Sequence, residues 1–195
     1  GFPDINIISE ENKEVPYSQR KEWASFWLVD PLDGTTEFIK RNGEFTVNIA
    51  LIESGVPILG VVYVPVSDTL YYGSEHGGFV CVGNENSKKL PLSMPSRDKL
   101  LVVASRSHFT DETRAYVESR GKDFEIISKG SSLKLCVVAE GTADIYPRLG
   151  PTMEWDTAAA HAIANAAGKK VHLHDSEEEL RYNKESLLNP WFVVE

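Results

Sequence analysis

The sequence predicts an α/β protein with an antiparallel or mixed sheet in its first half and an α/β layer in its second half. Runs of β-branched residues joined by short turns fill the first half, whereas the second half alternates short apolar strands with helices that end at glycine. The 195 residues are 42% apolar and 25% charged, which is typical of a globular protein with a stable core.

The first three segments differ in their hydrophobic pattern. Pro3–Ile8 is partly apolar and runs toward a pair of glutamates, which predicts a strand that leads into an acidic loop. Asn12–Lys21 is polar and contains a proline, so we expect an exposed loop. Phe26–Val29 is an uninterrupted apolar run that stops at Asp30, and it predicts a strand buried on both faces.

The next four segments predict an antiparallel meander. Phe45–Ile52 and Ile58–Val64 are rich in β-branched residues and flank a Glu-Ser-Gly-Val-Pro turn, which is typical of a hairpin. Thr69–Tyr72 and Gly78–Val82 are expected to continue the sheet as further antiparallel strands.

A proline-containing segment separates the two halves. Pro91–Lys99 shows no clear period and predicts a boundary between a metal-binding domain of residues 1–96 and an α/β domain of residues 97–195. The second half is expected to hold helices at Asp111–Arg120, Ser132–Glu140 and Asp156–Ala167, and strands at Leu101–Ala104, Phe124–Ile127, Ala143–Tyr146 and Lys170–His174.

Charge and composition exclude several classes of protein. The net charge of −9 argues against a general nucleic-acid surface, and no apolar run is long enough to span a membrane. Cys81 and Cys136 stand far apart in apolar segments and are interpreted as buried thiols of a protein in the reducing cytoplasm. Peripheral attachment at the inner membrane face remains a further option.

The segment Asp30-Pro-Leu-Asp-Gly-Thr-Thr-Glu-Phe is the most informative in the chain. Asp30 stands at the end of a predicted strand, and Asp33 follows across a predicted turn, so the two carboxylates can converge. Mg²⁺ prefers carboxylate, carbonyl and phosphate oxygens in octahedral geometry. The Leu32 carbonyl is a further candidate ligand.

The same turn offers backbone donors to an anion. Gly34 lets the chain approach a ligand closely, and the N–H groups of Gly34, Thr35 and Thr36 can point at a phosphate near the start of a helical turn at Glu37–Arg41. The alternative for an isolated motif of this kind is an Asx-turn in which Asp33 caps a helix.

Two further acidic sites favour the metal-site interpretation. Asp156 is expected at the start of a helix, as its cap and as a ligand, and Glu10 follows the first strand. Together with Asp30 and Asp33 these acids form a repulsive cluster unless cations neutralise them. The sequence therefore predicts a magnesium-dependent phosphatase.

Three motifs occur in the order in which the inositol monophosphatase superfamily has them, namely the acidic pair, the DPLDGTTEF segment and Trp155-Asp-Thr-Ala-Ala. The chain resembles this superfamily along essentially its whole length. The resemblance implies a layered α/β/α/β/α sandwich and two or three Mg²⁺ ions, with inhibition by Ca²⁺ and Li⁺. It also implies that Thr35, Glu10 and Asp33 act in catalysis. The implied metal ligands are the side chains of Glu10, Asp30, Asp33 and Asp156 and the carbonyl of Leu32.

Other segments resemble the bisphosphate-nucleotidase branch of this superfamily, namely FIKRNGEF from Phe38, SRSH from Ser105, GSSLK from Gly130 and YPR from Tyr146. This resemblance implies hydrolysis of 3′-phosphoadenosine 5′-phosphate to AMP and phosphate in sulfur metabolism. The residues implied to contact the nucleotide are His108, Ser131, Lys134 and Arg148, beside Asp33, Gly34, Thr35, Thr36 and Asp156.

Several alternatives remain open at this point. The substrate is inositol phosphate or fructose bisphosphate in one alternative, and in another the chain is a non-catalytic metal-dependent binding protein. Ser131 alone is a helix cap, and Lys134 and Arg148 alone are surface charges. His172 and His174 are expected as a solvated pair, and His161 as a packing residue or a support for the site.

The resemblance also sets an expectation about the start of the chain. Members of the superfamily carry some tens of mostly helical residues before the acidic pair, including an acid that helps to activate water. A chain that starts at Gly1 is therefore expected to bind metal weakly, to hydrolyse poorly and to expose apolar sheet surface.

Overall fold

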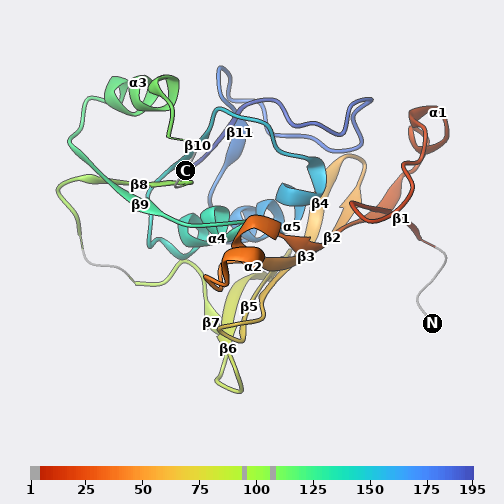
Figure 1. Ribbon diagram of the computed structural model, residues 1–195, viewed down its shortest axis with the longest axis horizontal. Helices are drawn as coiled ribbons and strands as arrows, with labels where there is room; N and C mark the ends of the chain where they lie inside the picture. Colours follow the sequence, from red (N-terminus) through yellow and green to blue (C-terminus); the bar gives the residue numbers. More distant parts are fainter. Residues whose placement is uncertain (1–4, 94–95, 106–108) are drawn as a thin grey trace.

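The computed structural model describes residues 5–93, 96–105 and 109–195 and shows a mixed α/β fold built around one large twisted sheet (Figure 1). The sheet has seven strands in chain order: β1 (Asn6–Ser9), β2 (Ser25–Asp33), β3 (Thr46–Glu53), β4 (Val56–Val64), β5 (Thr69–Ser74), β6 (Gly77–Val82) and β7 (Lys88–Lys89). Strand β1 is parallel to β2, and every later neighbour is antiparallel. The predicted hairpin and meander are confirmed.

The second half forms two smaller sheets. Strands β8 (Leu100–Ala104) and β9 (Phe124–Ser128) pair in parallel, with α3 (Asp111–Ser119) between them along the chain. The other sheet has the order β10 (Tyr146–Arg148), β12 (Phe192–Val194) and β11 (Val171–Leu173). The helices α4 (Leu133–Glu140) and α5 (Glu154–Ala166) complete this half.

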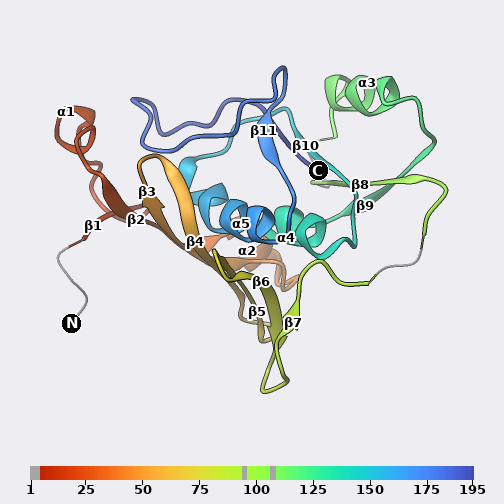
Figure 2. The same cartoon turned by 180° about the vertical axis from the view of Figure 1, so that it is seen from behind.

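Helix α5 lies on one face of the large sheet and beside α4, as both cartoon views show (Figure 2). Glycines in β4 and β5 permit this contact, since a Cβ on Gly60 would lie 2.0 Å from the carbonyl oxygen of Ala159, and one on Gly73 would lie 2.7 Å from the Cα of Ile163. A single apolar cluster contains residues from β2, β4, α4 and α5. The division at residues 96 and 97 stays a prediction, and this core extends across it.

Strand β2 differs from its prediction in two ways. It does not stop at Asp30 but continues to Asp33, with a register shift against β3 between these two residues. Phe26 and Leu28 are fully buried, whereas Trp27, between them, is only half-buried, so the prediction of burial on both faces is wrong. The reason is the antiparallel meander, in which successive side chains point to opposite faces and α5 covers only one.

Other boundaries also differ from the predictions. The expected exposed loop at Asn12–Lys21 contains a short helix, α1 (Tyr17–Arg20), and Arg20 is only 1% exposed. Only the last residue of the predicted strand Ala143–Tyr146 belongs to β10, and β12 was not predicted. Helix α5 begins at Glu154, two residues before the predicted start.

Two predicted side-chain environments are wrong. Cys81 is half-buried rather than buried, and its thiol donates to the Glu85 carbonyl oxygen at 3.0 Å. His172 is buried, and its Nδ1 lies 2.9 Å from the Ser176 carbonyl oxygen, so it is not solvated. Within the described ranges, no helix is both long and apolar enough to span a membrane.

Candidate active site

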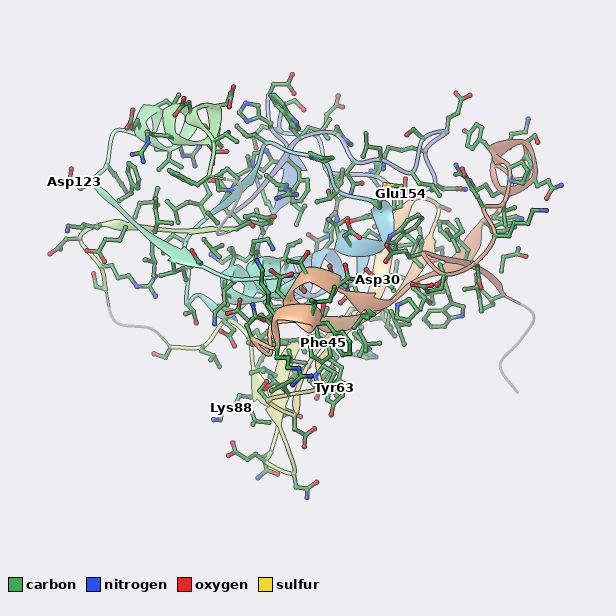
Figure 3. All side chains as sticks on the ribbon, in the orientation of Figure 1. Asp30, Phe45, Tyr63, Lys88, Asp123 and Glu154 are labelled. Carbon is green, nitrogen blue, oxygen red and sulfur yellow. The ribbon has the colours of Figure 1, made fainter. Side chains whose placement is uncertain are left out.

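Three aspartates from two distant parts of the chain converge at one point. Asp30 and Asp33 lie at the end of β2, and Asp156 lies in the first turn of α5. One carboxylate oxygen from each lies within 4.8 Å of the other two. Figure 3 shows Asp30 on β2 near the start of α5, which Glu154 marks. This arrangement suits one or more hard cations, which prefer clustered carboxylate oxygens.

Asp33 is the most strongly held of the three carboxylates. Its Oδ2 accepts from the Ser132 N–H at 2.7 Å and lies 2.8 Å from the Ser132 Oγ. Thr46 Oγ1 and Asn48 Nδ2 donate to the same oxygen at 3.3 Å each. These donors fix the orientation of the carboxylate before any ligand arrives.

Asp156 is the third residue of α5 and not its cap, because the helix begins at Glu154. Its Oδ2 accepts from the N–H of Met153, the capping position, at 2.7 Å, so the side chain still supports the start of the helix. The prediction that Asp156 is the cap is therefore wrong: Met153 is the capping residue, and the Asp156 carboxylate reaches back three residues to accept from its N–H.

The raised pKa values of two of the aspartates indicate that three negative charges in the cluster are unfavourable without a cation. Burial raises the pKa of Asp30 from its ordinary value of 3.8 to about 8, and the charge of Asp33 adds to the rise. Burial also raises the pKa of Asp156, to about 7, again with a contribution from Asp33. A bound cation would reverse both effects, so the donor set fits a metal ion.

Asp30→Asn tests the cost of a charged Asp30 in the folded protein through the pH dependence of its stability. Folded Asp30 keeps its proton up to a pH of about 8, whereas the unfolded chain loses it near 3.8, so folding of the metal-free protein becomes weaker as the pH rises between these values. We expect Asp30→Asn to raise the melting temperature at pH 8 by roughly 5 °C and to change it little at pH 4.

The measurement is thermal unfolding in chelator, with Asp68→Asn as the control. Asp68 lies in an exposed turn, where it accepts a hydrogen bond from the Tyr63 hydroxyl at 2.8 Å. A difference between Asp30→Asn and the parent that stays constant from pH 4 to pH 8 would contradict the account.

Asp33 and Asp156 line a cavity of about 460 Å³, which is the candidate substrate pocket. The loop after β2, the start of α4, β10 and the start of α5 form its walls. The lining residues among the predicted site are Asp33, Gly34, Thr36, Ser131, Lys134, Arg148 and Asp156.

Gly34 holds the turn in a form that few other residues adopt. Its φ is +87°, and a Cβ there would lie 2.2 Å from Ser131 Oγ. The Ser131 hydroxyl lies 2.9 Å from the Asp33 carbonyl oxygen and 2.8 Å from that of Glu44. Ser131 therefore joins the Asp33-Gly34 turn to the start of α4. Its hydroxyl was expected to face an anion, but it contacts these backbone carbonyl oxygens instead.

Two cations lie on the pocket wall. Lys134 is 8% exposed, its Nζ donates to the Ser131 carbonyl oxygen at 2.6 Å, and burial lowers its pKa to about 8. Arg148 donates from Nη2 to the Pro151 carbonyl oxygen at 2.7 Å. The buried Nε of Arg148 has no hydrogen-bond partner within the described ranges.

The remaining predicted residues are not gathered in the cluster. Glu10 is exposed and lines a neighbouring depression, although its charge raises the pKa of Asp30. Leu32 donates its N–H to Asp30 Oδ1 at 3.0 Å, and Thr35 is the first residue of α2 (Thr35–Lys40). His108 lies outside the described residues.

Sequence reasoning missed the residues that support the acids. Ser132 is 2% exposed, and its Oγ lies 2.6 Å from the Asp156 carbonyl oxygen as well as near Asp33. Asn48 donates from Nδ2 to the same Oγ at 2.8 Å. The alternation of β3 places Asn48 among the buried positions, and a polar residue there was the available signal.

Comparison with known proteins gives a consistent result. A family model described as inositol monophosphatase family matches residues 1–190. A Salmonella typhimurium protein named 3′(2′),5′-bisphosphate nucleotidase CysQ is 52% identical over 194 residues, which cover 98% of this chain and 76% of the relative. The Haemophilus influenzae protein of the same name is 37% identical, with coverage of 99% and 72%.

Solved structures give the same picture. CysQ from Bacteroides thetaiotaomicron, described as a bacterial member of the inositol monophosphatase family, is 52% identical with a TM-score of 0.92, covering 98% of this chain and 77% of that one. Inositol monophosphatase II from Staphylococcus aureus has a TM-score of 0.78 at 20% identity, with coverage of 99% and 72%, a likeness of fold alone.

Proposed function

Because this chain belongs to the inositol monophosphatase family, we propose that it is a 3′(2′),5′-bisphosphate nucleotidase, which hydrolyses 3′-phosphoadenosine 5′-phosphate to AMP and phosphate. The CysQ proteins that it resembles at 50–52% identity carry the name of this activity. As part of the same proposal, the reaction belongs to nucleotide recycling during sulfur assimilation in the cytoplasm.

One observation carries the proposal: two of the three clustered aspartates line a pocket whose wall also holds two cations. Asp33 and Asp156 reach the pocket directly, and Lys134 and Arg148 lie on its wall. Hydrolysis of one phosphomonoester needs the carboxylates and their metal, whereas binding of a second anionic group needs positively charged side chains. The chain has a net charge of −9, so such charge must be local.

The cofactor in this proposal is magnesium, with two or three ions. The proposed ligands are the carboxylates of Glu10, Asp30, Asp33 and Asp156 and the carbonyl of Leu32. When bound, Mg²⁺ supplies a Lewis acid that activates water and neutralises charge on the phosphoryl oxygens. A small-molecule phosphorylated nucleotide is the proposed partner.

The chain's own residues then bind and orient the substrate. The N–H groups of Gly34, Thr35 and Thr36 donate to oxygens of the scissile phosphate. Thr35 orients the attacking water. Asp33, held by Ser132, keeps its carboxylate in a fixed orientation, as a ligand of a metal beside the reacting phosphate requires.

The second phosphate and the base need a separate surface. Lys134 adds a compact positive charge, and Arg148 offers a planar fork that suits two phosphate oxygens. His108 and the Ser131 end of α4 complete this surface in the proposal. An inositol monophosphate has a single phosphate and no base, so it would make little use of this region.

A substrate panel on the full-length protein tests the proposal. We expect phosphate release from 3′-phosphoadenosine 5′-phosphate to require Mg²⁺, to be inhibited by Ca²⁺ and Li⁺, and to exceed release from inositol 1-phosphate or fructose 1,6-bisphosphate. Faster turnover of inositol phosphate would leave only the phosphatase activity, and nucleotide binding without turnover would indicate a binding protein.

A further inference from the structure

The first turn of α5, which carries Asp156, is held by a segment near the end of the chain. We term this segment, Tyr182–Asn189, the C-terminal clasp. Glu154 is fully buried, and its carboxylate accepts from the backbone N–H of Asn183 at 2.8 Å and that of Lys184 at 3.0 Å. The Lys184 Nζ donates to the same carboxylate at 2.6 Å. A buried carboxylate with three donors is a strong local restraint.

The clasp also holds Thr157, the residue after Asp156. Asn189 donates from Nδ2 to the Thr157 Oγ1 at 3.0 Å and to the Met153 carbonyl oxygen at 2.8 Å. The Tyr182 hydroxyl donates to the same Oγ1 at 3.3 Å and lies 2.9 Å from Nδ1 of buried His161. Thr157 lines the substrate pocket, so these bonds reach its wall.

Arg20 ties the clasp to the connection between β1 and β2. Its Nη1 donates to Asn183 Oδ1 at 2.9 Å and to the Lys184 carbonyl oxygen at 2.6 Å, and its Nη2 donates to the Glu185 carbonyl oxygen at 2.8 Å. Asn183 Nδ2 donates back to the Arg20 carbonyl oxygen at 2.8 Å. Arg20 is nearly fully buried, which makes this link well defined.

The cluster of aspartates explains why the start of α5 needs the hydrogen bonds from the C-terminal clasp. One carboxylate oxygen from each of Asp30, Asp33 and Asp156 lies within 4.8 Å of the other two, so charged forms of these groups repel one another until a cation neutralises them. Among the described residues, the Asp156 carboxylate accepts a hydrogen bond from the N–H of Met153, at the start of its own helix. Without a restraint from outside the helix, this repulsion would displace the start of α5. Octahedral magnesium tolerates little displacement of its ligands, so such a shift would weaken metal binding.

We propose that the C-terminal clasp positions Asp156 for metal binding, and that Tyr182 is a positioning residue that acts on the site through Thr157. The inference rests on the proposed role of Asp156 as a metal ligand. Groups that support metal ligands from outside the coordination sphere typically change affinity by about 10- to 100-fold. Tyr182 acts through one intervening residue, so the lower end of this range is expected.

The test is Tyr182→Phe, which removes one hydroxyl and keeps the ring. Calorimetric titration of the full-length protein with Mg²⁺ alone is expected to show about tenfold weaker binding. Thr157→Val removes the acceptor of the same bond and should weaken binding to a similar extent. The double variant should lose less affinity than the sum of the two single losses, because the bond between Tyr182 and Thr157 is common to both changes.

Tyr71→Phe is the matched control. Tyr71 is a similarly buried tyrosine whose hydroxyl donates to Glu140 Oε1 at 2.8 Å, outside the substrate pocket. It should lower the melting temperature about as much as Tyr182→Phe while leaving Mg²⁺ affinity unchanged.

Four outcomes overturn the inference. Unchanged Mg²⁺ affinity in Tyr182→Phe, or losses that add fully in the double variant, would show that Tyr182 contributes only to stability. An equal loss of affinity in Tyr71→Phe would show a general effect of destabilisation. Absence of Mg²⁺ binding by the parent would contradict the proposed metal site as well, which separates that failure from the others.

Discussion

Asp33→Asn is expected to lower hydrolysis of 3′-phosphoadenosine 5′-phosphate at least about 100-fold while leaving the fold intact. Loss of a residue that supports a metal ligand typically costs about 10- to 100-fold in metal affinity or activity, and loss of a proposed ligand should cost more. Asn has nearly the same shape and can still accept from Ser132 through its amide oxygen. It removes one charge from a mutually repulsive cluster, so the metal-free protein should be no less stable than the parent.

Steady-state kinetics with saturating Mg²⁺, together with thermal unfolding in chelator, measure both parts of this prediction. Asp68→Asn carries the same chemical change in an exposed turn and should keep the parent's activity. Full activity of Asp33→Asn in chelator would contradict the metal site, and a large fall in its melting temperature would show a mainly structural role.

Lys134→Met and Arg148→Ala are expected to reduce kcat/KM for the bisphosphate nucleotide about 30-fold each, the size of a charged hydrogen bond worth about 2 kcal/mol. A simple monoester such as p-nitrophenyl phosphate should change less than about threefold, because the acid cluster remains. Methionine keeps most of the buried stem of Lys134, which is only 8% exposed, so loss of packing is limited.

The control for lost positive charge is Lys99→Met. Lys99 pairs with Glu125 at 3.0 Å on an exposed surface and is not part of the pocket wall. Equal losses on the two substrates in Lys134→Met and Arg148→Ala would contradict the assignment of these cations to substrate choice. Unchanged kinetics on both substrates would remove them from the site.

The local patterns of the chain predicted much of the fold and part of the site. The hairpin and meander follow from β-branched runs and a Glu-Ser-Gly-Val-Pro turn, which specify a sheet through neighbours in sequence. Asp30 and Asp33 were identifiable because a short turn joins them. Asp156 was identifiable only because its motif accompanies them, since spatial proximity across more than a hundred residues leaves no periodic signal.

The supports of the site could not be predicted from local pattern. Ser132 looks like an ordinary helix-start residue, and its contacts with Asp33 and Asp156 exist only after α4 and α5 pack together. Arg20 looks like a surface cation in a polar loop, and it is buried because the C-terminal clasp supplies carbonyl acceptors. Ser131 was assigned to an anion, although its hydroxyl is bonded to backbone carbonyls.

Hydrolysis of 3′-phosphoadenosine 5′-phosphate in ¹⁸O-labelled water, with Mg²⁺ and mass spectrometry of both products, tests the central claim most directly. If water attacks the 3′-phosphorus, the bond between phosphorus and the 3′-oxygen breaks and that oxygen leaves as a hydroxyl. The account predicts inorganic phosphate with one ¹⁸O atom, unlabelled 5′-AMP, and no products in chelator. Release of 3′-AMP, ¹⁸O in the nucleoside product, or undiminished turnover without metal would contradict it.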